Sequence, residues 1–181
     1  MKKIDLKHQP SNWILQQIKK IDFKKKSIDV LDFASGFGRH SIQMSKEGNF
    51  VTAIDRDQEK LNYYKHIKNI ETICFDLEID QIWPLKKNFY DLVIVTNYLY
   101  RPRINEIGKL VREEGYILYE TFSEGNEKYG SPKSSKFLLK DRELIDIFQD
   151  EFEIINYFNG SVEEPIKKII QRCTLKKKTV K

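Results

Sequence analysis

The residues Asp32-Phe33-Ala34-Ser35-Gly36-Phe37-Gly38-Arg39-His40 (DFASGFGRH) follow a short apolar run and precede a segment with helical spacing. Two glycines separated by one residue predict a tight turn in which a ligand can approach the backbone. Such a turn at the start of a helix usually binds phosphate. Asp32, however, stands four residues before Gly36 and would repel a phosphate group. The stretch therefore predicts a ligand site, and its carboxylate argues against phosphate.

Length and cysteine content limit the kinds of protein that this chain can form. Its 181 residues fit one domain, residues 1–181. Cys74 and Cys173 lie far apart in no metal-ligand spacing, so we expect neither a disulfide scaffold nor a metal site. No apolar run approaches the ~20 residues of a membrane span, and the N-terminus lacks the apolar core of a signal peptide. We therefore expect a cytoplasmic protein without a membrane segment.

The charge balance leaves two interpretations open. The net charge is +5, with 32 Lys and Arg against 27 Asp and Glu. A basic protein can bind nucleic acid, but lysines also serve as solvated surface residues. The densest runs are Lys24–Lys26 and Lys176–Lys178, and the other lysines are scattered. A solvated surface is the favoured interpretation, and nucleic-acid binding stays the alternative.

Strand-like apolar runs alternate with helix-like segments through the first two thirds of the chain. The expected strands are Ser27–Phe33, Phe50–Ile54, Glu71–Phe75, Tyr90–Thr96 and Gly115–Thr121. The expected helices are residues 10–20, Arg39–Glu47, Asp57–Ile67, Arg103–Arg112 and Asp141–Gln149. This alternation is typical of a parallel sheet with helices on both faces.

The last third of the chain predicts a different pairing. Two strand-like runs, Phe152–Phe158 and Ile166–Leu175, are separated by a loop too short for a helical crossover, so they should be antiparallel neighbours. We therefore expect an α/β fold, a Rossmann-like three-layer sandwich whose seven-stranded, mostly parallel sheet ends in an antiparallel hairpin. Residues 1–26 should form an N-terminal helical segment, residues 123–136 a lid loop, and residues 176–181 a basic tail.

Three carboxylates follow the first three expected strands. Asp32, Asp55 and Asp76 stand where parallel strands end, which is the edge at which open α/β sheets bind ligands. Asp55 follows Gly36 by 19 residues, a spacing typical of the acid that binds ribose in dinucleotide sites. Ser41 replaces the third glycine of that motif, and Asp32 would face the pyrophosphate. S-adenosylmethionine removes this conflict, because it has ribose and adenine but carries an ammonium and a sulfonium in place of phosphate.

The stretch Val30–Arg39 resembles the first motif of class I S-adenosylmethionine-dependent methyltransferases. The expected terminal hairpin is also a mark of that fold. In this resemblance Asp55 is similar to the ribose-binding acid, and Asp76-Leu77 to the adenine-contacting pair. The residues that the resemblance and the loop together assign to the cofactor are Asp32, Ala34, Gly36, Gly38, Arg39, Asp55, Arg56, Asp76, Leu77 and Asn97.

Within that superfamily, three stretches resemble the small bacterial tellurite-resistance and thiol-methylating group. They are TNYLYRP (residues 96–102), LYETF (118–122) and FLLKDREL (137–144). The sequence departs from the group where Tyr100 stands in place of a histidine, so the catalytic base is left unassigned. A tyrosine with its ordinary pKa of ~10 is a poor base at neutral pH.

We therefore expect in-line methyl transfer to a small molecule such as a thiol or a chalcogen oxyanion. The candidates for the acceptor pocket are Trp13, Asn97, Tyr98, Tyr100 and Arg101, the last as a partner for an anion. RNA methylation is the alternative. Enzymes that methylate amino groups of bases carry an Asp/Asn-Pro-Pro-Tyr/Phe motif after the fourth strand, and residues 97–100 lack its two prolines. A non-catalytic module that binds a nucleotide cofactor is the third interpretation.

Overall fold

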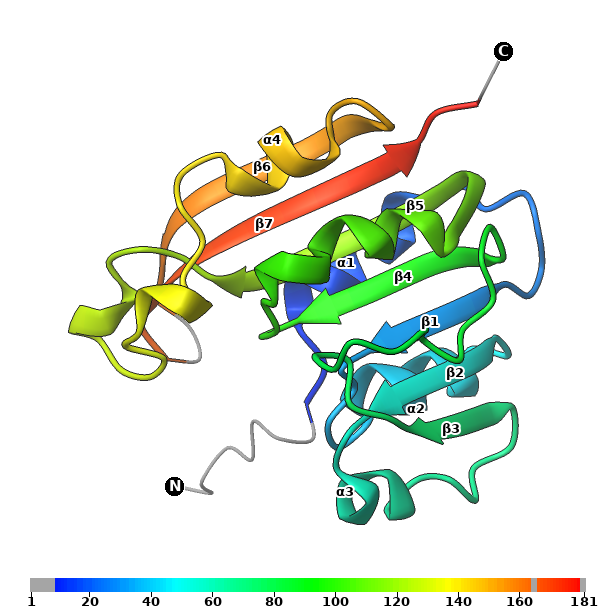
Figure 1. Cartoon of the computed structure of the whole chain (residues 1–181). Coiled ribbons are helices and arrows are strands. Elements are labelled where there is room, and N and C mark those ends of the chain that lie inside the picture. The colour runs from blue at the N-terminus through cyan, green and yellow to red at the C-terminus, as the bar shows by residue number, and fades with distance from the viewer. Residues whose placement is uncertain (1–8, 164–165, 180–181) are drawn as a thin grey trace.

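The computed structural model of the chain describes residues 9–163 and 166–179, which form a three-layer arrangement around a seven-stranded sheet (Figure 1). The strand order is β3-β2-β1-β4-β5-β7-β6. The strands are β1 (Asp29–Phe33), β2 (Phe50–Asp55), β3 (Ile70–Cys74), β4 (Tyr90–Thr96), β5 (Val111–Phe122), β6 (Phe152–Val162) and β7 (Lys168–Lys177). The expected fold class is confirmed.

Strand direction also follows the expectation. β1 to β5 are parallel, whereas β7 pairs antiparallel with both β5 and β6. The order reverses on either side of β1, which pairs with β2 on one side and β4 on the other. Such a switch point opens a crevice at the carboxyl ends of the strands.

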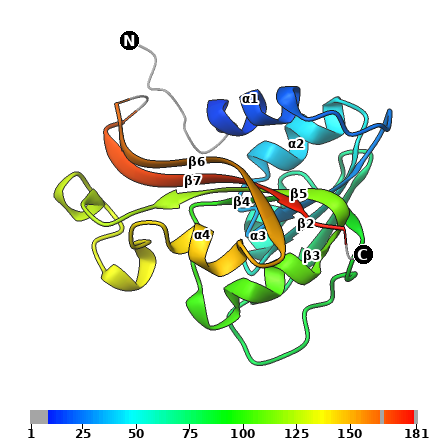
Figure 2. The same ribbon diagram turned by 90° about the horizontal axis from the view of Figure 1, so that it is seen from above.

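The helices cover the two faces of the sheet, as the view from above shows (Figure 2). On one face α1 (Asn12–Lys20), α2 (Arg39–Lys46) and α3 (Gln58–Asn62) contribute to one apolar core. On the other face, the 3-10 helix η1 (Arg101–Lys109) and α4 (Glu143–Phe148) pack in a second core. Two short 3-10 turns, η2 (Asn126–Lys128) and η3 (Ser135–Phe137), lie after β5. The helices expected at 57–67 and 141–149 are thus shorter in the structure.

The central strand β4 explains why two cores form. Leu92 and Ile94 belong to the core under α1 and α2, whereas Val93 and Val95 belong to the core under η1. All four side chains are fully buried. A continuous apolar run is what a strand covered on both faces requires.

One expected helix is wrong at its end. Residues 103–112 were expected to be helical, but η1 ends at Lys109 and Arg112 lies in β5. The strand begins early because Val111 pairs with Tyr90, and the register then shifts through an irregularity. Glu114, whose φ is 62°, lies in this irregular stretch.

The expected basic tail also starts inside a folded element. β7 continues to Lys177, and Lys176 pairs with Glu114. The ammonium of Lys177 donates to the Gly108 carbonyl at 2.8 Å. A terminal strand paired on both sides immobilises these lysines, and residues 180–181, like residues 1–8 of the expected N-terminal segment, lie outside the described residues.

The turn from β1 to α2 is held by Tyr64. Gly38 has a φ of 68° and is the N-cap of α2. A Cβ at Gly38 would lie 2.5 Å from the Tyr64 ring. The Tyr64 hydroxyl contacts the Ser35 hydroxyl at 2.8 Å and donates to the Gly36 carbonyl at 3.3 Å. Glycine is therefore required at 38 both by the backbone conformation and by the ring beneath it.

No helix in the described ranges is long and apolar enough to cross a membrane.

We predict that Gly38→Ala lowers the free energy of unfolding by about 3 kcal/mol, from left-handed strain plus overpacking against Tyr64. Gly48→Ala is the matched control, because Gly48 has a φ of 89° but open space around its Cβ position. It should cost about 1 kcal/mol. Urea titration measures both values, and equal losses would contradict a role for the Tyr64 contact.

Candidate active site

The buried carboxylate of Asp32 joins the end of β1 to the first turn of α2. One of its oxygens accepts from the Ser41 backbone N–H at 3.0 Å and from the Ser41 hydroxyl at 2.6 Å. The N-cap Gly38 has no side chain to satisfy the N–H groups of this turn, so Asp32 takes over that role. Burial raises the pKa of the Asp32 carboxyl to about 7, against the lowering effect of the Ser41 bonds.

Asp55 holds the glycine loop from the neighbouring strand. Its Oδ2 accepts from the Gly36 N–H at 2.8 Å, and its Oδ1 accepts from the Asp57 N–H at 2.9 Å. A carboxylate can accept roughly four hydrogen bonds, so lone pairs stay available for a ligand. The bond to Gly36 therefore links the ends of β1 and β2 at the edge where the cavity opens.

The ends of β1, β2, β3 and β4 surround a cavity of about 460 Å³, which we name the glycine-loop cavity. Two of its residues, Ala34 and Asn97, have φ values of 57° and 54°, uncommon for residues with a side chain. Such conformations concentrate at functional sites. The lining residues are Ala34, Ser35, Gly36, Phe37, Arg39, Asp55, Arg56, Lys60, Phe75, Asp76, Leu77, Glu78, Thr96, Asn97 and Tyr98.

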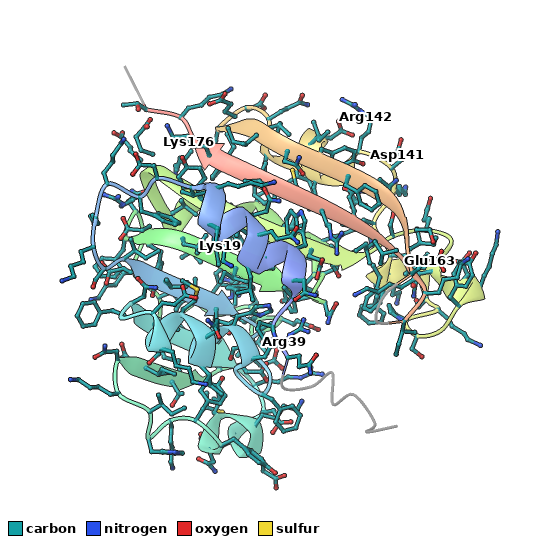
Figure 3. All side chains as sticks on the ribbon, turned by 180° about the vertical axis from the view of Figure 1, so that it is seen from behind. Lys19, Arg39, Asp141, Arg142, Glu163 and Lys176 are labelled. Carbon is teal, nitrogen blue, oxygen red and sulfur yellow. The ribbon has the colours of Figure 1, made fainter. Side chains whose placement is uncertain are left out.

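A second cavity of about 510 Å³, which we name the N-terminal cavity, shares Arg39 and Asn97 with the first. It is bounded by the segment before α1, the ends of β5 and β7, and the loop after β5. Figure 3 labels Arg39 beside the segment that precedes α1. The other lining residues are Gln9, Pro10, Ser11, Asn12, Glu120, Phe122, Asn126, Tyr129, Gly130, Ser131, Ile166, Lys167, Lys168 and Arg172.

The N-terminal cavity is rich in positive charge. Among the described residues, its lining includes two arginines and two lysines, and Glu120 is the one carboxylate. Glu120 is 2% exposed and accepts from Arg172 Nε at 2.7 Å. Burial lowers the pKa of Lys168, and the nearby Arg172 and Arg39 lower it further while Glu120 opposes them. The excess of cations over carboxylates favours an anionic ligand.

Eight of the ten residues expected to contact the cofactor line the glycine-loop cavity: Ala34, Gly36, Arg39, Asp55, Arg56, Asp76, Leu77 and Asn97. The structure places the other two behind it. Asp32 is 1% exposed and accepts from Ser41, so it lies outside the cavity lining, and its assignment to the cofactor stays a prediction. Gly38 is buried against Tyr64 and acts in packing the turn.

The residues expected around the acceptor divide among different places. Asn97 lines both cavities, and Tyr98 lines the glycine-loop cavity. Tyr100 lines a separate hollow between η1 and the β3–β4 connection. Trp13 is buried, with the Arg172 guanidinium 5.5 Å from its ring centre. Tyr100 and Trp13 therefore line neither the glycine-loop cavity nor the N-terminal cavity.

Arg101 does not have the anion-binding position that we expected. Its Nε lies 2.6 Å from Glu143, and its Nη atoms donate to the backbone carbonyls of residues 135, 136 and 138. The Glu143 contact raises the pKa of Arg101. This guanidinium therefore fastens the segment after β5 to α4.

Sequence reasoning missed the charged residues that β5 and β7 bring to the N-terminal cavity. Glu120, Lys168 and Arg172 lie in strands with apolar neighbours. Charged residues inside an apolar strand were the available signal. Their convergence with Arg39 depends on the pairing of β7 with β5, which places Arg172 opposite Glu120.

The family model described as tellurite resistance protein TehB matches residues 3–177, and the chain belongs to that family. The family model confirms the expected tellurite-resistance group, and the fold is the one that solved S-adenosylmethionine-dependent methyltransferases share. No match was found among curated proteins.

Solved structures share this fold. TehB from Haemophilus influenzae has a TM-score of 0.76 and 22% identity, over 93% of this chain and 63% of that chain. This chain therefore spans less than two thirds of that protein. A TehB-like SAM-dependent methyltransferase from Corynebacterium glutamicum has a TM-score of 0.64 and 18% identity, over 90% and 86%. A Burkholderia thailandensis N1-methyltransferase solved with S-adenosylhomocysteine has a TM-score of 0.68 and 16% identity, over 97% and 80%.

The glycine-loop cavity fits the cofactor of this class. Its volume lies within the roughly 300–1,000 Å³ of small-molecule sites. Asp55 and Asp76 offer acceptors for hydroxyl and amino groups, and Phe37, Phe75 and Leu77 offer apolar surface for a flat ring. The Tyr98 hydroxyl is buried and has no partner among the described residues.

We predict that Asp55→Ala weakens binding of S-adenosylhomocysteine by about tenfold or more, since lost hydrogen bonds to a charged acceptor cost ~1.5–3 kcal/mol. Calorimetry measures the affinity. Glu59→Ala is the control, because Glu59 is exposed on α3 and lies outside the cavity lining. Unchanged affinity in Asp55→Ala would remove this carboxylate from the site.

The raised pKa of Asp32 predicts a pH dependence of stability. The folded chain binds this proton more tightly, so the stabilisation is complete below the ordinary value of 3.8 and is lost as the pH rises through about 7. As the pH rises from 3.8 to about 7, the free energy of unfolding of the wild type should therefore fall relative to that of Asp32→Asn. Urea titrations at several pH values measure it, and a constant difference would refute the prediction.

Proposed function

We propose that the protein transfers a methyl group from S-adenosylmethionine to a small anionic acceptor, either a thiolate or a chalcogen oxyanion. The observation that carries this proposal is the junction of the two cavities. One is lined by the carboxylates and apolar groups that suit the cofactor, and the other is lined by cations. They meet at Arg39 and Asn97, which is where an acceptor would have to reach the methyl group.

Residues of the glycine-loop cavity have separate parts in holding the cofactor. Asp55 would accept from the ribose hydroxyls, and Asp76 with Leu77 would hold the adenine. Arg39 is available to the amino-acid end of the cofactor, because it projects from the first turn of α2 and donates to the Thr96 hydroxyl at 3.3 Å. When bound, S-adenosylmethionine supplies a methyl group already activated on a sulfonium.

Arg172 and Lys168 are the proposed acceptor-binding cations. The Arg172 guanidinium lies 5.5 Å from the Trp13 ring centre and 5.8 Å from the Phe158 ring centre, and Glu120 fixes its Nε. These contacts restrict its rotamer before the acceptor arrives, which lowers the entropy lost on binding. The expected importance of Trp13 thus becomes indirect, through Arg172.

The side chains have little proton chemistry to perform. The nucleophilic atom forms a bond to the methyl carbon as the carbon–sulfur bond breaks, so an acceptor that enters as an anion releases no proton. Cations around a thiol favour its thiolate form. The protein then acts by aligning the acceptor and excluding water. Methyl transfer to an anion therefore needs no general base at position 100, where this chain has a tyrosine in place of a histidine.

The loop after β5 is the proposed cover of the acceptor. Asn126 is buried and accepts from the Ile169 N–H at 3.1 Å, which anchors the loop to β7. Tyr129, Gly130 and Ser131 extend the cavity wall from this anchor. A wall of this kind encloses a small acceptor rather than an extended polymer.

A methyl-transfer screen tests the proposed activity. Purified protein is incubated with methyl-labelled S-adenosylmethionine and with selenite, tellurite, aromatic thiols, amines or RNA. Methylated selenite, tellurite or thiol supports the proposal. Transfer to RNA or amines alone would overturn it.

We predict that Lys168→Met raises KM for the anionic acceptor roughly tenfold, because a half-buried cation contributes more than a fully solvated one. The affinity for S-adenosylhomocysteine should stay within about twofold, since Lys168 lies outside the glycine-loop cavity. Lys128→Met is the control, with the same charge change at an exposed residue outside the cavity lining. Equal effects of the two variants would contradict a local role for Lys168.

A further inference from the structure

The first turn of α2 is bonded to the segment that precedes α1. Nε2 of His40 accepts from the Ser11 N–H at 3.1 Å, and Arg39 donates to the Gln9 carbonyl at 3.2 Å. We name residues 9–12 the N-terminal strap. All four strap residues line the N-terminal cavity. Two consecutive residues of α2 therefore hold one wall of the proposed acceptor site.

His40 can accept this hydrogen bond only as a neutral imidazole. The side chain is 1% exposed, and burial together with the nearby Arg39 lowers its pKa to about 3. At neutral pH the ring is therefore uncharged, and its lone pair is available to Ser11. The reaction proposed above gives this buried imidazole no proton to transfer.

We propose that His40 is a positioning residue, whose Nε2 holds the Ser11 amide and thereby sets the strap wall of the acceptor site. This inference rests on the proposed function for the identity of the acceptor. His40 itself lines neither the glycine-loop cavity nor the N-terminal cavity, so it acts through the strap.

Because the other polar groups of Ser11 serve α1, His40 and Arg39 are left to bond the strap to α2. The Ser11 hydroxyl accepts from the Ile14 N–H, and the Ser11 carbonyl accepts from the Leu15 N–H, so both of these groups serve to start α1. Pro10 has no N–H to donate. The strap is therefore bonded to α2 through the Ser11 N–H, which donates to His40, and through the Gln9 carbonyl, which accepts from Arg39.

The position of His40 also connects the two cavities. His40 and Arg39 follow Gly38 directly, and Arg39 lines both cavities. A cofactor that immobilises the glycine loop should therefore immobilise the strap as well. Hydrogen exchange can observe this without turnover.

Two pairs of variants isolate the bond. His40→Phe keeps a buried ring but removes the acceptor, and His40→Gln returns an acceptor oxygen. Ser11→Pro removes the donor N–H at a φ of −62° that proline adopts, and Ser11→Ala keeps the N–H while losing the same helix-capping hydroxyl. The second pair tests the bond even where a change at the buried His40 alters folding.

The readouts are hydrogen exchange of the strap amides, affinity for S-adenosylhomocysteine, and kinetics with sodium selenite. His40→Phe should exchange the Ser11 amide at least about tenfold faster and raise KM for selenite roughly tenfold, with kcat and cofactor affinity changed less than about threefold. His40→Gln should recover most of both effects. S-adenosylhomocysteine should slow strap exchange in the wild type more than in His40→Phe.

The Ser11 pair should reproduce the kinetic result. Ser11→Pro should raise KM well above Ser11→Ala, and adding His40→Phe to Ser11→Pro should raise it no further, because one bond is lost in each case. Unchanged strap exchange in His40→Phe, or equal KM in Ser11→Pro and Ser11→Ala, would overturn the positioning role. Failure of wild-type protein to methylate selenite counts against the proposed acceptor instead, and the exchange result still decides the role of His40.

Discussion

The bond between the buried Asp32 carboxylate and the first turn of α2 is the constraint on which the site depends. Gly38 must be glycine because its φ is positive and Tyr64 lies beneath it, so it cannot cap the helix with a side chain. Asp32, at the end of β1, supplies that cap to Ser41. The glycine loop is thus fixed at both ends, by the strand behind it and by the helix after it.

This arrangement gives the sheet edge two different carboxylates. Asp32 is buried and has a raised pKa, whereas Asp55 is half-buried and holds the Gly36 N–H on the cavity side. The two residues lie near the carboxyl ends of neighbouring strands, with Asp32 opposite Ala53, and they differ in solvation. Position at a strand end therefore does not decide whether an acid supports the loop or contacts the ligand.

That difference shows how far the sequence could predict the structure. The strands, the mostly parallel sheet and its antiparallel end followed from apolar runs and connection lengths, which are local features, whereas the strand order did not. The glycine-loop residues followed from motif spacing, but Asp32 and Gly38 do not line the cavity, because spacing does not show how deeply a residue is buried. Arg172 was missed because it reaches Glu120 only through the β5–β7 pairing, which is a long-range contact.

The two cavities also come from different parts of the chain. The glycine-loop cavity is built by residues between 34 and 98, whereas the N-terminal cavity takes the strap, β5, β7 and the loop between 123 and 131. Arg39 and Asn97 are the residues that both linings share. Under the proposed function, substitutions in the strap or in β7 should therefore alter acceptor binding without disturbing the carboxylates of the other cavity. The hydrogen bond between His40 and Ser11 limits this independence, because it joins the N-terminal strap to the same turn of α2 that Asp32 holds in place.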